Sequence, residues 1–393
     1  MAYLADQARN RYSIESRQRL STRLAFLVAG MGTSAWGALV PFAKSRMDLD
    51  PAELGLVLLC LGMGSLTAMP LAGRLTSRFG CRLVIVSSGA IASLLLPLLA
   101  IAPHPLLLAI SLSLFGAAIG TLDVSMNIQA VIVEKNHGKT LMSGFHGLYS
   151  VGGFIGAGGM ALMLSAGLRP SMACVSMTVI VVGTLCLAAP HLLRAAAAAA
   201  ERESPVFAVP HGAVIFLGIV CFAVFLAEGA TLDWGALLLT TNGGFTPDKG
   251  GLGYAVFAIA MTVGRLTGDR VIRRWGRKRV MMLGGLCAAA GFSIATLASA
   301  SQIALVGFLL IGLGASNIAP ILFTAAGRQQ DMPPAAAISA VTTLGYVGVL
   351  AGPALIGFVA HATSLRVAFG GLGCAMLLVA GSSRQGLVSQ SEK

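Results

Sequence analysis

The sequence has few charged residues. Asp, Glu, Lys and Arg make up 11% of the 393 residues, whereas an ordinary soluble domain has about a quarter, and 56% are hydrophobic. This composition excludes a soluble domain and a disordered chain. The apolar residues run continuously for roughly 18 positions or more instead of alternating, which also excludes an outer-membrane barrel. An all-α membrane protein remains.

The sequence also lacks the patterns of most cofactor-dependent proteins. Its seven cysteines contain no CxxC pair and fall mostly in apolar runs, so they are interpreted as small buried residues. No HExxH, GxSxG or nucleotide-binding loop occurs. We therefore predict neither an enzyme nor an ATP-driven pump, and we expect no cofactor and no metal.

Apolar runs bounded by charged, proline and glycine clusters predict twelve transmembrane helices, because one span takes about 20 residues. They lie at 24–43, 52–73, 83–102, 106–128, 141–165, 170–193, 211–240, 251–268, 280–300, 303–326, 335–360 and 364–381. The expected divisions are a cytoplasmic arm (1–23), a six-helix bundle (24–193), a central cytoplasmic loop (194–210), a second six-helix bundle (211–381) and a cytoplasmic tail (382–393).

Positive charge is distributed unequally over the predicted connections. If the N-terminus is inside, 22 of the 27 Lys and Arg residues, Arg265 among them, lie in inside segments. Such a bias places both termini in the cytoplasm. The formal net charge of +12 therefore indicates membrane topology rather than binding of nucleic acid.

The two halves of the sequence resemble each other at a nearly constant offset of 196 to 198 residues. Three pairs of segments share this offset, which indicates a duplicated six-helix unit. The pairs are Thr33–Leu39 with Thr231–Leu237, Arg78–Arg82 with Arg274–Lys278, and Val151–Gly156 with Val347–Gly352.

The basic segments Gly73–Arg82 and Gly268–Arg279 resemble the signature loop of the major facilitator superfamily. The resemblance implies two pseudo-symmetric six-helix bundles and a gate latched by charged groups at helix ends. In the first copy, Ser77 stands where the superfamily has Asp, so we expect the latch to depend mainly on Asp269. The implied gating residues are Gly73, Arg74, Arg78, Gly268, Asp269, Arg270 and Arg274.

Three further segments, Asp123–Asn127, Phe145–Gly152 and Glu228–Trp234, resemble a branch of bacterial inner-membrane permeases related to the fucose:proton symporters. The resemblance implies a multi-pass protein of the bacterial inner membrane that works by alternating access. It also places the aromatic residues Trp36, Tyr149, Trp234 and Tyr346 on helices that line the cavity. These rings can stack on a sugar or can simply pack against other helices, and the sequence leaves both open.

Carboxylates deep inside membrane spans are costly and usually functional. Asp123 and His146 lie at matching depths by the helical rise per residue, and Asn127 is one turn from Asp123 on the same helix face. A carboxylate, an imidazole and an amide at one depth suit proton transfer near neutral pH. The alternative is a purely structural set of hydrogen bonds between helices.

Glu228 lies just past the predicted midplane and precedes Gly229, so we expect a broken helix that faces a cavity. Glu228 is a candidate for binding the solute or the proton. The amide of Asn317 is a further candidate solute contact, although amides also join helices to one another.

The sequence thus predicts a secondary transporter that moves a small polar solute, with a sugar-like solute favoured, by proton-coupled symport. The alternatives are a metabolite or drug exporter that works by proton antiport, and a membrane sensor derived from a transporter. The expected partners are the solute, the proton and the lipid bilayer, and we expect a monomer.

Overall fold

In this computed structural model the described residues are 2–194, 209–242, 245–246, 249–298 and 300–383. They form helices and no strand. Eleven helical segments are long and apolar enough to cross a membrane, and helix α9 (Leu252–Trp275) occupies the place of the remaining predicted span, 251–268. Most of the predicted central loop (195–208) and of the predicted tail (384–393) lies outside the described residues.

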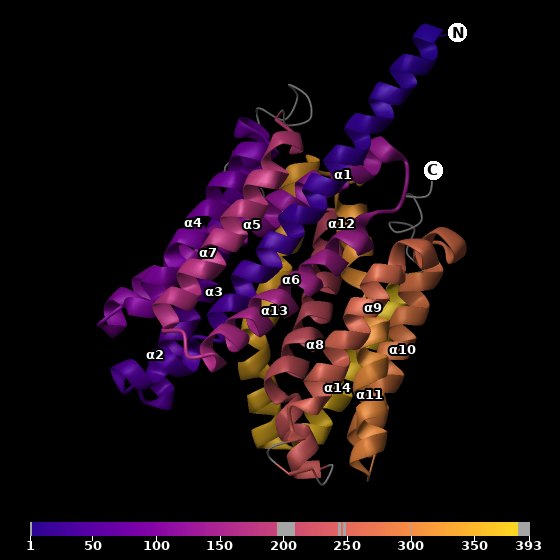
Figure 1. Cartoon of the computed structure of the whole chain (residues 1–393). Coiled ribbons are helices and arrows are strands. Elements are labelled where there is room, and N and C mark those ends of the chain that lie inside the picture. Colours follow the sequence, from indigo (N-terminus) through magenta and orange to yellow (C-terminus); the bar gives the residue numbers. More distant parts are fainter. Residues whose placement is uncertain (1, 195–208, 243–244, 247–248, 299, 384–393) are drawn as a thin grey trace. The chain divides into compact units, whose positions relative to one another are not determined.

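The contacts between helices divide the chain into two compact units (Figure 1). Unit 1 comprises Met1–Lys139 and Leu148–Val209, and unit 2 comprises Thr140–Gly147 and Pro210–Lys393. The division falls within helix α6, whose first residues pack with unit 2 and whose remainder packs with unit 1.

In unit 1, α3 packs against α5, α4 packs against α5 and α7, and α1 packs against α7. Proline supplies the first residue of α3, α5 and α7, where a missing backbone N–H costs no helical hydrogen bond. The helices of unit 1, with α6 shared between the units, are α1 (Ala2–Gly37), α2 (Val40–Met47), α3 (Pro51–Phe79), α4 (Cys81–Ile101), α5 (Pro105–His137), α6 (Met142–Ser165) and α7 (Pro170–Ala188), followed by the short 3₁₀ helix η1 (Ala189–His191).

In unit 2, α8 packs against α13, α10 packs against α11 and α14, and α9 packs against α11. The segment predicted as one span at 303–326 is two helices, which meet at Ser316 and Asn317. The helices of unit 2 are α8 (Ala213–Asn242), α9 (Leu252–Trp275), α10 (Arg277–Leu297), α11 (Ser301–Ala315), α12 (Ile318–Ala326), α13 (Pro334–Ala362) and α14 (Leu365–Ser382).

The backbone repeats between the units at the basic motif. Gly80 joins α3 to α4 with φ 82° and ψ 153°, and Gly276 joins α9 to α10 with φ 78° and ψ 154°. This region of positive φ favours glycine. The residues between the predicted spans, 74–82 and 269–279, are therefore mostly helical. They complete the ends of α3 and α9, and a single glycine makes the turn to the next helix.

Glycine also allows equivalent helices to cross closely in each unit. A Cβ on Gly152 of α6 would lie 2.3 Å from the Leu27 carbonyl oxygen of α1, and a Cβ on Gly348 of α13 would lie 2.4 Å from the Phe222 carbonyl oxygen of α8. Such contacts require the absence of a side chain. The repeated segments Val151–Gly156 and Val347–Gly352 thus supply the close helix crossing in each unit.

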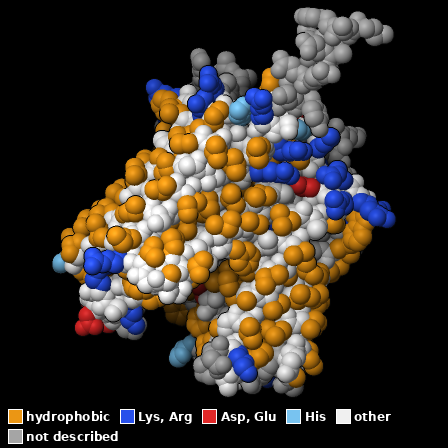
Figure 2. All heavy atoms as spheres, in the orientation of Figure 1, with side chains coloured by type: hydrophobic (Ala, Val, Ile, Leu, Met, Phe, Trp, Pro, Cys, Tyr) orange, Lys and Arg blue, Asp and Glu red, His pale blue; other side chains and the backbone are white. Residues whose placement is uncertain are grey.

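The surface is largely apolar. Figure 2 shows hydrophobic side chains along the helices, with Lys and Arg mainly near the helix ends, and Leu187 and Phe358 are 73% and 74% exposed. A surface of this kind fits a lipid environment. The helices α1 and α3 extend beyond the predicted spans at their charged ends, because charged residues end an apolar run without interrupting helical hydrogen bonds. The span predicted at 24–43 is divided, since α1 ends at Gly37 and α2 begins at Val40.

Candidate functional site

The break between α11 and α12 is the centre of a polar network in unit 2. The Ser316 hydroxyl donates to the Leu313 carbonyl oxygen at 2.7 Å. The Asn317 amide nitrogen donates to the Gly264 carbonyl oxygen of α9 at 3.1 Å and to Ser316 Oγ at 2.9 Å. The Ser316 side chain thus bonds to a carbonyl oxygen near the end of α11, and the Asn317 side chain links the break to α9.

Two glycines of α9 make room for this break. A Cβ on Gly264 would lie 2.4 Å from Ser316 Oγ, and one on Gly268 would lie 1.8 Å from Asn317 Oδ1. Any side chain at either position would collide with the polar residues at the break. Gly268, which was predicted to belong to the gate, thus acts in helix packing, and Asn317 joins α12 to α9.

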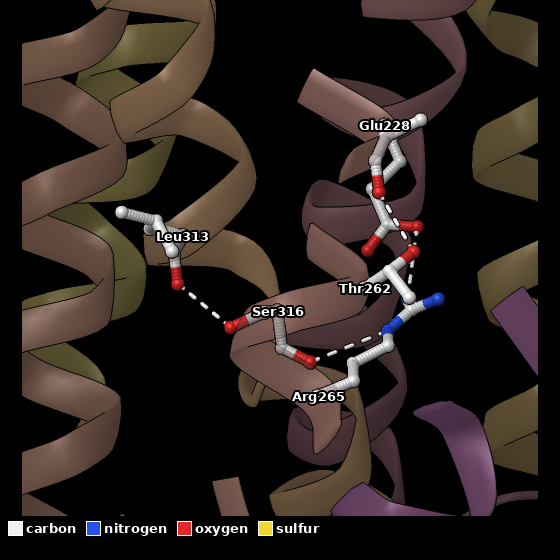
Figure 3. Close-up of polar contacts among 6 residues, drawn as sticks. Glu228, Thr262, Arg265, Leu313 and Ser316 are labelled. Carbon is white, nitrogen blue, oxygen red and sulfur yellow. Dashed lines mark hydrogen bonds and ion pairs between the residues drawn. The ribbon is translucent and has the colours of Figure 1, made fainter. Parts of the chain in front are cut away.

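Arg265 lies between these glycines and connects the break to α8. Its Nη2 lies 3.5 Å from Glu228 Oε2, and its Nε donates to the Ser316 carbonyl oxygen at 3.4 Å. The side chains of Arg265 and Glu228 are 9% and 21% exposed. Figure 3 shows the Thr262 side chain beside this pair. An ion pair this deep within helices is expected at a functional position.

Only one of the two carboxylate oxygens of Glu228 contacts Arg265. Its Oε1 is buried and has no hydrogen-bond partner in the described part of the chain. The predicted break at Glu228 and Gly229 is wrong, because α8 runs without interruption from Ala213 to Asn242. A Cβ on Gly229 would be 3.5 Å from Val349 Cα of α13, an ordinary van der Waals contact, so this glycine neither interrupts α8 nor marks a close helix crossing.

His146 belongs to the same unit through the first turns of α6. Its ring stacks on Phe323 of α12 with centroids 5.5 Å apart, and the residue is 8% exposed. Arg265 lies within electrostatic range of His146, and Tyr254 lies within range of both Glu228 and Arg265. The structure therefore brings the predicted residues His146 and Glu228 into one polar region.

Asp123 and Asn127 lie on α5 in unit 1. The fully buried Asn127 donates its amide N–H to the Asp123 main-chain carbonyl oxygen at 2.9 Å. Within the described residues of unit 1, the half-buried Asp123 carboxylate has no ion-pair partner. Because His146 belongs to unit 2, the pairing of Asp123 with His146 stays a prediction.

Asp269 caps the start of α6. Its Oδ1 accepts the backbone N–H of Ser143 and its Oδ2 accepts that of Gly144, both at 3.0 Å. A carboxylate at a helix N-terminus is stabilised by these N–H groups and by the helix dipole. In the first copy of the motif, the Ser77 hydroxyl donates only to the Arg74 carbonyl oxygen of its own helix, at 3.1 Å.

The predicted aromatic residues differ in their surroundings. Trp36 is 4% exposed, and the main-chain carbonyl oxygen of Tyr149 lies where a Cβ on Gly30 would be. Tyr346 packs edge-on against Phe225. The Trp234 ring lies 3.2 Å from the Cβ position of Gly357, and its buried Nε1 has no hydrogen-bond partner in the described part of the chain.

The predicted location of Arg265 in a cytoplasmic segment is wrong. It was counted among the inside positive charges, but it is buried within α9 and paired with Glu228. The sequence could have indicated its burial, because residue 265 lies within the span predicted at 251–268. Removing it from the count leaves the charge bias clear.

Long apolar helices around a buried polar network define a polytopic membrane protein of the transport class, and comparison with known proteins gives the family. The sequence profile of the Major Facilitator Superfamily matches residues 24–330 and residues 213–382. The chain belongs to this superfamily. It is therefore a multi-pass membrane transporter and not an enzyme.

Two curated relatives are similar over most of their length. An uncharacterized MFS-type transporter of Yersinia pestis is 53% identical over 93% of this chain and 95% of its own. The membrane protein MosC of Rhizobium meliloti is 32% identical over 90% of this chain and 84% of its own. The solved structure of the Escherichia coli fucose:proton symporter has a similar fold, with a TM-score of 0.76 and 17% identity over 94% of this chain and 98% of that chain.

Proposed function

We propose that this transporter moves a small polar solute together with a proton, in symport, and that Glu228 binds the proton. The observation that carries the proposal is the buried Glu228–Arg265 pair with its unused Glu228 Oε1. A proton can bind at Oε1 without displacing a hydrogen bond. It would neutralise Glu228 and weaken the attraction to Arg265, which changes the charge balance beside the helix break.

A sugar-like solute is the first class to test, and import is the favoured direction. The similar fold of a fucose:proton symporter supports this choice. So do Trp36, Tyr149, Trp234 and Tyr346, since aromatic faces suit sugar rings. Asn127 and Asn317 supply amide groups, although the Asn317 amide nitrogen already bonds to α9 and Ser316.

The test uses purified protein in proteoliposomes with an imposed pH gradient and a mixture of sugars, sugar acids and amino acids outside. We expect one solute class to accumulate, and a protonophore to abolish the accumulation. Glu228→Gln should accumulate nothing, whereas Asp233→Asn, an exposed position on the same helix, should behave as the wild type. Accumulation that ignores the pH gradient, or that survives Glu228→Gln, contradicts the proposal.

A further inference from the structure

Arg265 carries a permanent positive charge in a buried position. A guanidinium stays protonated in proteins, and a buried charge without a counter-charge costs several kcal/mol. In the structure Glu228 Oε2 supplies the counter-charge. If Glu228 binds a proton during transport, this compensation is lost and another anion must replace it.

The geometry of the pair suits such an exchange. Charge-assisted contacts between nitrogen and oxygen usually measure about 2.7–2.9 Å, but Arg265 Nη2 and Glu228 Oε2 are 3.5 Å apart and Glu228 uses one oxygen only. A guanidinium fork matches both oxygens of a carboxylate. The contact with Glu228 is thus looser than the one that an incoming carboxylate can make.

Among the described residues, four further ionisable groups on α6, α8 and α9 are poor replacements for the Glu228 carboxylate. Asp269 lies four residues further along α9, and its two carboxylate oxygens accept hydrogen bonds from the backbone N–H groups of Ser143 and Gly144. Asp233 is exposed and lies five residues beyond Glu228, on a different side of α8. His146 and Tyr254 are within electrostatic range of Arg265, but an imidazole or a phenol is no anion near neutral pH.

We propose that the transported solute carries a carboxylate, which replaces the Glu228 carboxylate on Arg265 when Glu228 is protonated. The inference rests on the proposed function and narrows its solute to an acid, such as a sugar acid. It gives Arg265 the role of selecting the solute by charge. The proton and the anion then move together, and Arg265 has a counter-charge in both states.

Chemical rescue tests this inference without knowledge of the solute. Glu228→Ala removes the carboxylate, and thermal unfolding in detergent is then followed at neutral pH with potassium acetate, or with acetamide as a neutral molecule of similar shape. We expect acetate to raise the unfolding temperature of the variant saturably, by about 2–4 °C, and acetamide to have no effect. The double variant Glu228→Ala/Arg265→Ala should lose the response, and Asp233→Ala should show none beyond that of the wild type.

Glu228→Gln repeats the measurement with the side-chain volume kept, in case Glu228→Ala does not fold. An equal response to acetamide, no response to acetate, or a response that persists without Arg265 overturns the inference. Failure of the two proposals can be distinguished. Acetate rescue without pH-driven accumulation contradicts only the proton coupling, and accumulation without acetate rescue contradicts only the carboxylate.

Discussion

Asp123 in unit 1 and Glu228 in unit 2 are both carboxylates within long apolar helices, yet their surroundings differ. Glu228 faces Arg265 of a neighbouring helix at 3.5 Å, whereas Asp123 has no ion-pair partner within the described residues of unit 1. The helix crossings at Gly152 and Gly348 by contrast are alike, because each glycine faces a carbonyl oxygen of the neighbouring helix. Close packing at this glycine pair is thus common to both copies, while the buried carboxylates lie at non-equivalent positions and differ in their partners.

Breaking the pair in unit 2 should have the largest effect on stability. Arg265→Gln leaves the Glu228 carboxylate buried without its counter-charge, and we expect a loss of about 3 kcal/mol. The double variant Arg265→Gln/Glu228→Gln should recover most of this loss, because two amides need no charge balance. Thermal unfolding in detergent measures both, with Arg273→Gln, an exposed position on α9, as the control. An additive double variant would show that the two residues are not coupled.

The glycine crossings permit a sharper comparison. A Cβ on Gly156 of α6 would lie 2.4 Å from the Met31 carbonyl oxygen, but a Cβ on Gly352 of α13 would lie 3.5 Å from Leu226 Cδ1. We therefore expect Gly156→Ala to cost about 1–3 kcal/mol and Gly352→Ala to be neutral or slightly stabilising. Gly158→Ala, which would meet nothing within 4 Å, controls for helix propensity. Equal losses at Gly156 and Gly352 would mean that the two crossings are equally tight.

The charged motif should show a smaller asymmetry. Asp269→Ala removes the acceptor of two backbone N–H groups at the start of α6 and should cost about 1–2 kcal/mol. Ser77→Ala removes one hydrogen bond within its own helix and should change stability by less than about 0.5 kcal/mol. Unfolding measurements decide the matter, and a matching loss at Ser77 would contradict the asymmetry. If the cap also serves the gate, Asp269→Ala should slow transport as well.

Much of the fold could be predicted because its signals are local. Apolar runs give the spans, and the offset of 196 to 198 residues gives the duplication. The ends of α1 and α3 could not be predicted in this way, because hydropathy reports where the lipid ends and not where helical hydrogen bonding ends. The candidate site could be predicted only in part, because its contacts join helices that are distant in sequence.

Two features of the site depend on partners that are distant in sequence. The break at Ser316 and Asn317 is stabilised by hydrogen bonds to Gly264 and Arg265 of α9. The sequence at 303–326 alone shows one continuous apolar run. Gly229 suggested a break that α8 does not have, because a single glycine weakens a helix by only about 1 kcal/mol and does not by itself interrupt it. Arg265 looked like a topology signal, since its pairing with Glu228 appears only when α8 and α9 are adjacent.

The most direct test of the account asks which acid binds the proton. Infrared difference spectra between low and high pH, recorded on purified protein in lipid, detect the carbonyl stretch of a protonated carboxyl group. We predict a band from a buried carboxyl group that Glu228→Gln removes and that Asp123→Asn leaves in place. A band that survives Glu228→Gln and disappears in Asp123→Asn would move the proton to unit 1 and contradict the central role of the Glu228–Arg265 pair.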